Sequence, residues 1–66
     1  MKGKLLNINY DKGYGFLRGE DGKEYFFHRD SLVNKPDWDE CTSNRLCTFE
    51  ATTGQKGPRA ENVMIL

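Results

Sequence analysis

The chain has no apolar run that approaches the ~20 residues needed to cross a bilayer. Its opening segment, MKGKLLNINYDKG, lacks the apolar centre of a signal peptide. Hydrophobic residues make up 36% and charged residues 30% of the 66 residues, a mixture typical of a globular protein. We therefore expect a single domain over residues 1–66, located in the cytoplasm and without membrane contact.

Cysteine and histidine are scarce. Two cysteines, Cys41 and Cys47, and one histidine, His28, are too few for a four-ligand zinc site, and no C-x-x-C occurs. We expect reduced, unlinked thiols, with Cys47 acting as a small core hydrophobe. A paired nucleophile and base and a phosphate-cradling loop are also missing from the sequence. An enzyme is therefore the weakest functional hypothesis, and we expect no metal and no cofactor.

The chain also lacks an excess of charge, with ten Lys and Arg against ten Asp and Glu. This balance argues weakly against a nucleic-acid partner, because phosphate binding depends on a positive field. The charges are uneven, however: residues 1–29 carry six basic and four acidic side chains, whereas residues 30–66 carry four and six. The distribution leaves room for a local positive patch.

Apolar residues at helical spacing are absent over any long stretch, and glycines interrupt the chain every few residues. Short alternating segments instead predict strands over residues 2–9, 14–18, 24–28, 45–52 and 60–66. A helical turn is expected over 29–32 and turn-rich loops over 33–44 and 53–59. Asp21-Gly22 is typical of a tight hairpin turn. Five short antiparallel strands in so few residues predict a small closed barrel, since closure removes exposed edges.

Aromatic residues are concentrated on the second and third predicted strands, which hold five of the eight in the chain. Alternation places one set on the core face: Leu17, Tyr25 and Phe27. The opposite face presents a second set together: Tyr14, Phe16, Phe26 and His28. A slip of one residue would exchange the two faces.

Contiguous rings facing water usually mark a binding surface. Flat rings flanked by cations suit unstacked nucleobases and their phosphates, and the cations available are Lys12, Arg18 and Arg29. Gly13 and Gly15, on either side of Tyr14, are expected to leave room for a flat ligand. On the fourth strand, alternation predicts an apolar face that consists of Cys47, Phe49 and Ala51.

Three segments resemble motifs of the bacterial cold-shock domain. DKGYGFL, residues 11–17, resembles its K-G-F-G-F-I motif, and YFFH, residues 25–28, resembles V-F-V-H. TGQKGPRAENV, residues 53–63, resembles the final hairpin with its K-G-P and A-x-N-V. The opening GKLLNIN fits the family's G-x-V-K-W-F-N register without gaps, so the resemblance covers nearly the whole chain.

This resemblance implies an all-β fold, the five-stranded antiparallel Greek-key β-barrel known as the OB-fold. It also implies a sequence-tolerant site for single-stranded RNA or DNA on the second and third strands. Trp38 falls where the family has a stacking aromatic in a loop, and we expect it at an exposed loop tip. The alternative is a tryptophan that covers one end of the core. The residues expected at the nucleic-acid interface are Asn7, Lys12, Tyr14, Phe16, Phe26, His28, Arg29, Trp38 and Lys56.

The chain departs from the family pattern at three interface positions. Asn7 replaces an exposed Trp, Leu6 replaces a Lys, and Arg29 replaces a Phe. Each lost ring removes ~1–3 kcal/mol of stacking. Arg29 can offset part of this loss, because a guanidinium can stack on a base and reach a phosphate. In the core, Tyr25 and Phe27 stand where the family has valines, and a small Ala51 is expected to match them.

The leading hypothesis is a monomeric, non-catalytic binder of single-stranded RNA or DNA, acting as an RNA chaperone or as a regulator of transcription or translation. The alternative is a small-barrel protein-interaction module with a degenerated nucleic-acid site. The missing Trp, the zero net charge and the acidic segment DWDE, residues 37–40, favour that alternative.

Overall fold

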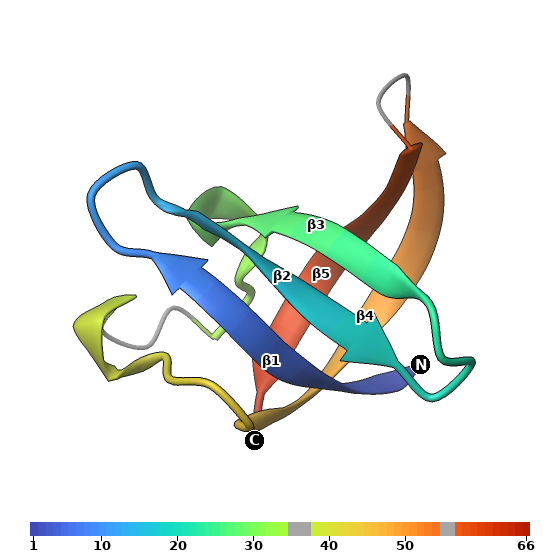
Figure 1. Ribbon diagram of the computed structural model, residues 1–66, viewed down its shortest axis with the longest axis horizontal. Helices are drawn as coiled ribbons and strands as arrows, with labels where there is room; N and C mark the ends of the chain where they lie inside the picture. Colours follow the sequence, from blue (N-terminus) through green and yellow to red (C-terminus); the bar gives the residue numbers. More distant parts are fainter. Residues whose placement is uncertain (35–37, 55–56) are drawn as a thin grey trace.

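The computed structural model describes residues 1–34, 38–54 and 57–66, and within them the protein is a closed barrel of five strands (Figure 1). The strands are β1 (Lys2–Asn9), β2 (Tyr14–Gly19), β3 (Glu24–His28), β4 (Leu46–Gly54) and β5 (Gly57–Ile65). Two short 3₁₀ turns, η1 (Arg29–Ser31) and η2 (Trp38–Glu40), lie in the connection between β3 and β4. None of the helical segments described is long enough to cross a membrane.

The strand order around the barrel is β1-β2-β3-β5-β4, with β4 pairing back onto β1. A meander of three strands with the fourth beside the first is a Greek key. The predicted all-β Greek-key barrel is therefore confirmed. One strand pair differs from the antiparallel prediction: β3 meets β5 in parallel, through the Phe26–Arg59 pair.

The first three strands lie where alternation predicted them, and glycines shape the turns between them. Gly13, with φ of 74°, ends the β1–β2 turn, and its N–H donates to the Asn9 carbonyl over 3.0 Å. Gly22, with φ of 81°, occupies the β2–β3 turn after Asp21. Both backbone conformations disfavour residues with a Cβ, so glycine allows these tight connections.

The final hairpin is longer than the sequence predicted. Residues 53–59 were expected to form a turn-rich loop, but the β4–β5 ladder continues through Thr53–Pro58 to Gly54–Gly57. In Figure 1 this hairpin projects beyond the rest of the barrel. Pro58 is tolerated because it lies near the hairpin end, where a missing N–H interrupts little of the ladder.

The core is formed by the inward faces of all five strands, together with Leu32 and Cys41. The expected core residues Leu17, Phe27 and Phe49 are buried, and so is Tyr25, whose ring centroid lies 5.0 Å from that of Phe49. Cys47 is a fully buried thiol, as expected, and burial raises its pKa to about 11.

The expected burial of Ala51 is wrong. Ala51 is exposed, although its Cα partner Ala60 on β5 is fully buried. It lies on the part of β4 that extends beyond the rest of the barrel, where residues 50–54 are all exposed (Figure 1). Ala51 therefore does not compensate for the large Tyr25 and Phe27 side chains.

Candidate nucleic-acid interface

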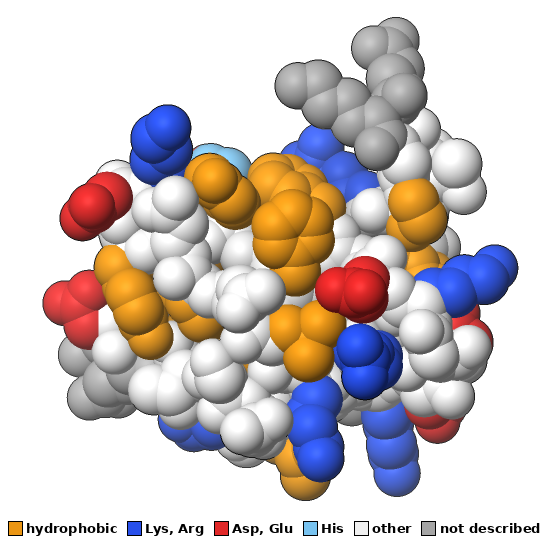
Figure 2. Space-filling view, viewed as in Figure 1, with side chains coloured by type: hydrophobic (Ala, Val, Ile, Leu, Met, Phe, Trp, Pro, Cys, Tyr) orange, Lys and Arg blue, Asp and Glu red, His pale blue; other side chains and the backbone are white. Residues whose placement is uncertain are grey.

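Three aromatic side chains form a contiguous outward surface on β2 and β3, here called the ring platform: Tyr14, Phe16 and Phe26. Phe16 lies directly opposite Phe26 in the antiparallel pair. The Phe26 centroid lies 5.5 Å from that of Tyr14 and 5.8 Å from that of Phe16. The Phe16 ring is 40% exposed, and the other two are half-buried. Figure 2 shows these hydrophobic side chains as an orange group beside the pale blue histidine.

A hydrogen bond from Asn9 orients the Tyr14 ring. Asn9 Nδ2 donates to the Tyr14 hydroxyl over 3.2 Å, while Asn9 Oδ1 accepts from the Lys12 backbone N–H over 3.0 Å. The same side chain therefore holds both the β1–β2 turn and the edge of the ring platform.

His28 lies opposite Tyr14 on the platform side of β3, with 37% of its side chain exposed. The Asp30 backbone N–H donates to its Nδ1 over 3.2 Å, and Asp30 Oδ2 lies 3.5 Å from the same atom. Because Nδ1 accepts this hydrogen bond, the donor of the ring is its Nε2–H group.

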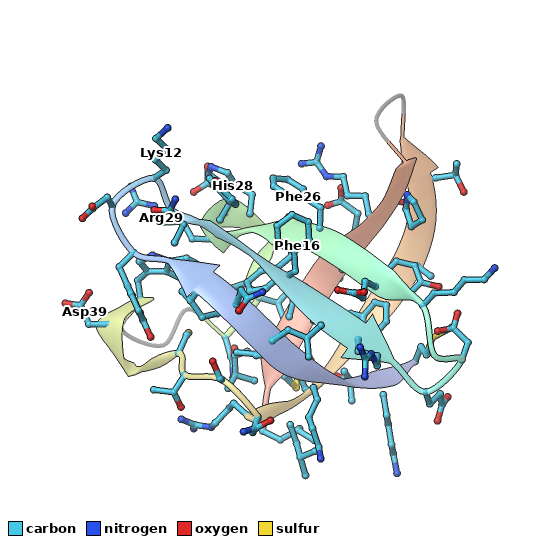
Figure 3. All side chains as sticks on the ribbon, in the orientation of Figure 1. Lys12, Phe16, Phe26, His28, Arg29 and Asp39 are labelled. Carbon is cyan, nitrogen blue, oxygen red and sulfur yellow. The ribbon has the colours of Figure 1, made fainter. Side chains whose placement is uncertain are left out.

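Two cations lie at the same end of the platform as His28 (Figure 3). Lys12 and Arg29 are both exposed. The Arg29 N–H donates to the Gly13 carbonyl over 2.9 Å. This bond joins the end of β3 to the start of β2 and places Arg29 beside the turn that carries Lys12.

Gly13 and Gly15 do not leave the expected room for a ligand. Both are buried. A Cβ on Gly15 would lie 2.5 Å from the Asn7 carbonyl and 3.0 Å from the Phe27 ring, and one on Gly13 would lie 3.1 Å from Arg29 Cδ. The space that these glycines create is occupied by the protein itself.

The structure places Asn7 opposite Phe16 across the β1–β2 pair, in an exposed position beside the platform. It also brings Arg59 next to the platform, since Arg59 is the Cα partner of Phe26. Arg59 Nε lies 2.8 Å from Glu61 Oε1. Sequence alone missed Arg59 because the β3–β5 contact joins distant segments. Lys56, another predicted interface residue, lies outside the described residues.

The predicted exposed loop position of Trp38 is wrong. Trp38 is half-buried and packs against the core, with its centroid 6.0 Å from that of Phe27 and 6.4 Å from that of Tyr10. Tyr10 in turn donates its hydroxyl proton to the Cys41 carbonyl over 2.7 Å. The geometry supports the alternative, in which Trp38 covers one end of the core.

Comparison with known proteins agrees with this arrangement over the whole chain. A family described as the "'Cold-shock' DNA-binding domain" matches residues 1–66. This chain belongs to the cold-shock domain family. Cold shock protein ScoF of Streptomyces coelicolor is 38% identical over 61 residues, covering 92% of this chain and 91% of that protein. Cold shock-like protein CspE of Escherichia coli K12 is 35% identical over 66 residues, covering 100% and 96%.

Membership of the family supports nucleic-acid binding as the family-level function of this cold-shock domain. Its platform has fewer rings than the family pattern has, since Asn7 and Arg29 stand at two aromatic positions. Asn7 lies beside Phe16, and Arg29 lies beside Gly13. The two departures therefore affect different ends of the interface.

Proposed function

We propose that this cold-shock domain binds single-stranded RNA or DNA with low sequence specificity by stacking bases on Tyr14, Phe16 and Phe26. The observation that carries the proposal is the contiguity of the three rings on one outward face, with centroid separations of 5.5–6.4 Å. Stacking of a base on an aromatic ring contributes ~1–3 kcal/mol and tolerates any base, because every base has a π face.

Charged and polar groups around the rings complement the other parts of a nucleotide. Lys12 and Arg29 at one end of the platform suit phosphates, which cations neutralise with release of counterions. The Nε2–H group of His28 can donate to a base edge or a phosphate oxygen. Arg59, next to Phe26, adds a third cation whose charge is partly balanced by Glu61.

The biological consequence follows from mass action. A protein that binds the open strand of a hairpin, and not the paired form, shifts the equilibrium towards the open strand. The domain therefore acts as an RNA chaperone or as a regulator of transcription or translation, as a monomer in the cytoplasm. It requires no cofactor and catalyses no reaction in this role.

Two ring truncations test the proposal. Phe16→Ala and Phe26→Ala should each weaken binding of a single-stranded pyrimidine oligomer of about six nucleotides by a factor of about 5 to 150, equivalent to ~1–3 kcal/mol. The measurement is a fluorescence-anisotropy titration with a labelled oligomer. Met64→Ala removes a similarly exposed apolar side chain from β5 and should leave the affinity unchanged.

Phe16→Ala should keep its unfolding midpoint, because the Phe16 side chain is exposed. Phe26→Ala removes a half-buried ring and is compared with the parent under conditions where both proteins are folded. Equal affinities of both variants and the parent would reject the stacking site. If the parent itself fails to bind any single-stranded oligomer, the protein-interaction alternative replaces the proposed function.

A further inference from the structure

An open groove of about 480 Å³ lies next to the ring platform, at the end of β2 and the start of β1. Its charged lining consists of Lys2 and Lys4 from β1, Arg18 from β2 and Glu20 from the following turn. Three cations therefore face one carboxylate in a chain whose overall charge is zero. This groove is a local positive patch on an otherwise balanced surface.

Two cations of the groove face each other across a strand pair. Lys4 and Arg18 are direct Cα partners across the β1–β2 pair, while the partner of Arg18 on its other side is an acidic residue, Glu24. Like charges in that position repel each other and destabilise a sheet. Within the described residues, the side chains of Lys2, Lys4 and Arg18 form no hydrogen bond or ion pair. An anionic ligand would relieve the repulsion.

The groove continues the platform on the same face of the sheet. Phe16 and Arg18 both point outward from β2, two residues and about 7 Å apart along the strand. On the neighbouring strand, Asn7 pairs with Phe16, and Lys4 pairs with Arg18. Figure 2 shows blue Lys and Arg side chains on the same face as the orange ring group. A strand leaving Phe16 in this direction therefore reaches the groove next.

A bulge in β1 supplies part of the apolar lining. The β1–β2 register shifts between Leu5 and Asn7, so that Leu6 is an extra residue in the pair. Leu5 is fully buried, whereas Leu6 lines the groove together with Leu46, which is 56% exposed. Ser43 Oγ donates to the Leu6 carbonyl over 2.7 Å and holds the bulge. The groove therefore has cations that can contact a phosphate and apolar side chains that can contact the attached sugar.

We propose that this groove binds the sugar–phosphate backbone of nucleotides that extend beyond the ring platform, with Lys2, Lys4 and Arg18 contacting phosphates. The inference rests on the proposed single-strand binding and lengthens its site. It assigns a role to cations that line the groove and lie outside the ring platform. Short oligomers use the platform alone, and longer ones use both surfaces.

The test compares the affinities of a long and a short oligothymidine, of about twelve and about six nucleotides. For single strands, log K changes by ~0.7 per phosphate contact and per log unit of salt. At an ionic strength of ~0.1 M, each contact is therefore worth a factor of about 5. Arg18→Gln should lower the long-to-short affinity ratio about fivefold, and Lys2→Gln/Arg18→Gln about 25-fold. The affinity for the short oligomer should stay near that of the parent.

Two controls isolate the groove. Lys23→Gln removes one charge from the β2–β3 turn, outside the groove, and should leave the ratio unchanged. Lys2→Arg/Arg18→Lys keeps both charges and should retain the ratio of the parent. Thermal unfolding should show that Arg18→Gln remains folded, since the variant removes both the repulsion with Lys4 and the attraction to Glu24.

The outcomes separate this inference from the proposed function. If Lys2→Gln/Arg18→Gln has the same long-to-short affinity ratio as the parent, the groove does not bind the strand, and the proposal for the groove is wrong. This result would also be expected if the groove bound an acidic protein. The ring platform would not be affected by it. Failure of the parent to bind the short oligomer overturns the platform itself.

Discussion

Asn7 and Phe16 lie directly opposite each other across the β1–β2 pair, and only one of the two is aromatic. The family pattern has a Trp at the Asn7 position, so the platform ends at Phe16 where another ring would extend it. Side chains opposite each other in an antiparallel pair lie ~5 Å apart. A ring at position 7 would therefore lie within stacking reach of the next base.

Asn7→Trp is expected to raise the affinity for single-stranded oligomers about 5- to 150-fold, as one added stacking ring contributes ~1–3 kcal/mol. Anisotropy titration against the parent measures the change. Met64→Trp adds the same ring to an exposed position on β5 and should bind like the parent. An Asn7→Trp affinity no higher than that of Met64→Trp would place the bound strand elsewhere.

The salt dependence of short-oligomer binding should be shallow. Lys12 and Arg29 are the cations at the His28 end of the platform, and Arg59 lies beside Phe26. Two or three phosphate contacts give a slope between about −1.4 and about −2.1 in log K against log salt concentration. Titrations over a range of salt concentrations measure this slope. Lys12→Gln should reduce its magnitude by ~0.7. An affinity independent of salt, or a much steeper slope, contradicts the interface as described.

Trp38 and Phe16 should have opposite roles. Trp38 packs against the core, so Trp38→Ala should lower the free energy of unfolding by about 1–3 kcal/mol, less than the ~3–5 kcal/mol of a fully buried ring. Denaturant unfolding measures this loss. Under conditions where the variant is folded, its oligonucleotide affinity should stay close to that of the parent.

Phe16→Ala is the matched control, because it should bind the oligonucleotide more weakly than the parent while its free energy of unfolding stays the same. If Trp38→Ala instead loses affinity while its stability is unchanged, Trp38 stacks on a base as the family resemblance implies.

A hydrogen bond in the β2–β3 turn makes stability depend on pH. The Tyr25 hydroxyl donates to Asp21 Oδ2 over 2.6 Å, and this bond is the main cause that lowers the pKa of Asp21 below its ordinary value of 3.8. A lowered folded-state pKa contributes stability that is present above pH ~4 and is lost as the pH falls through the folded-state value.

Tyr25→Phe should therefore unfold more easily than the parent at neutral pH, and the difference should shrink in strong acid. Denaturation midpoints across the acid range measure it, together with NMR titration of the Asp21 carboxyl group, whose pKa should rise in the variant. Asp11→Asn, in the exposed β1–β2 turn, is the control and should not reproduce this pattern. If the difference in stability between Tyr25→Phe and the parent is the same at low pH as at neutral pH, the hydrogen bond to Asp21 does not cause it.

The inner and outer faces of β2 and β3 could be predicted from the sequence because strand alternation is local. Once Tyr14–Arg18 and Glu24–His28 are strands, the pleat alone decides that Tyr25 and Phe27 face inward and Phe26 faces outward. The same reasoning was wrong about the burial of Ala51, because alternation gives the face of a strand residue but not whether the rest of the barrel covers it.

Trp38 and Arg59 show a second limit. Trp38 was expected at an exposed loop tip, but the half-buried position of its ring depends on Phe27 and Tyr10, which come from distant parts of the chain. Arg59 joins the platform only because β5 closes the barrel against β3. Contacts between segments far apart in sequence are formed by the fold, so a local pattern cannot show them.

The sequence by itself determined the strand class, the turns at Gly13 and Gly22, and which rings share the outer face of β2 and β3, because these depend on φ preferences and on the pleat. Only the tertiary structure decided that Lys2, Lys4 and Arg18 line one groove, that Arg59 lies beside Phe26 and that Trp38 covers the core. Those relationships arise where barrel closure and strand register bring separate segments together, and no single segment encodes them.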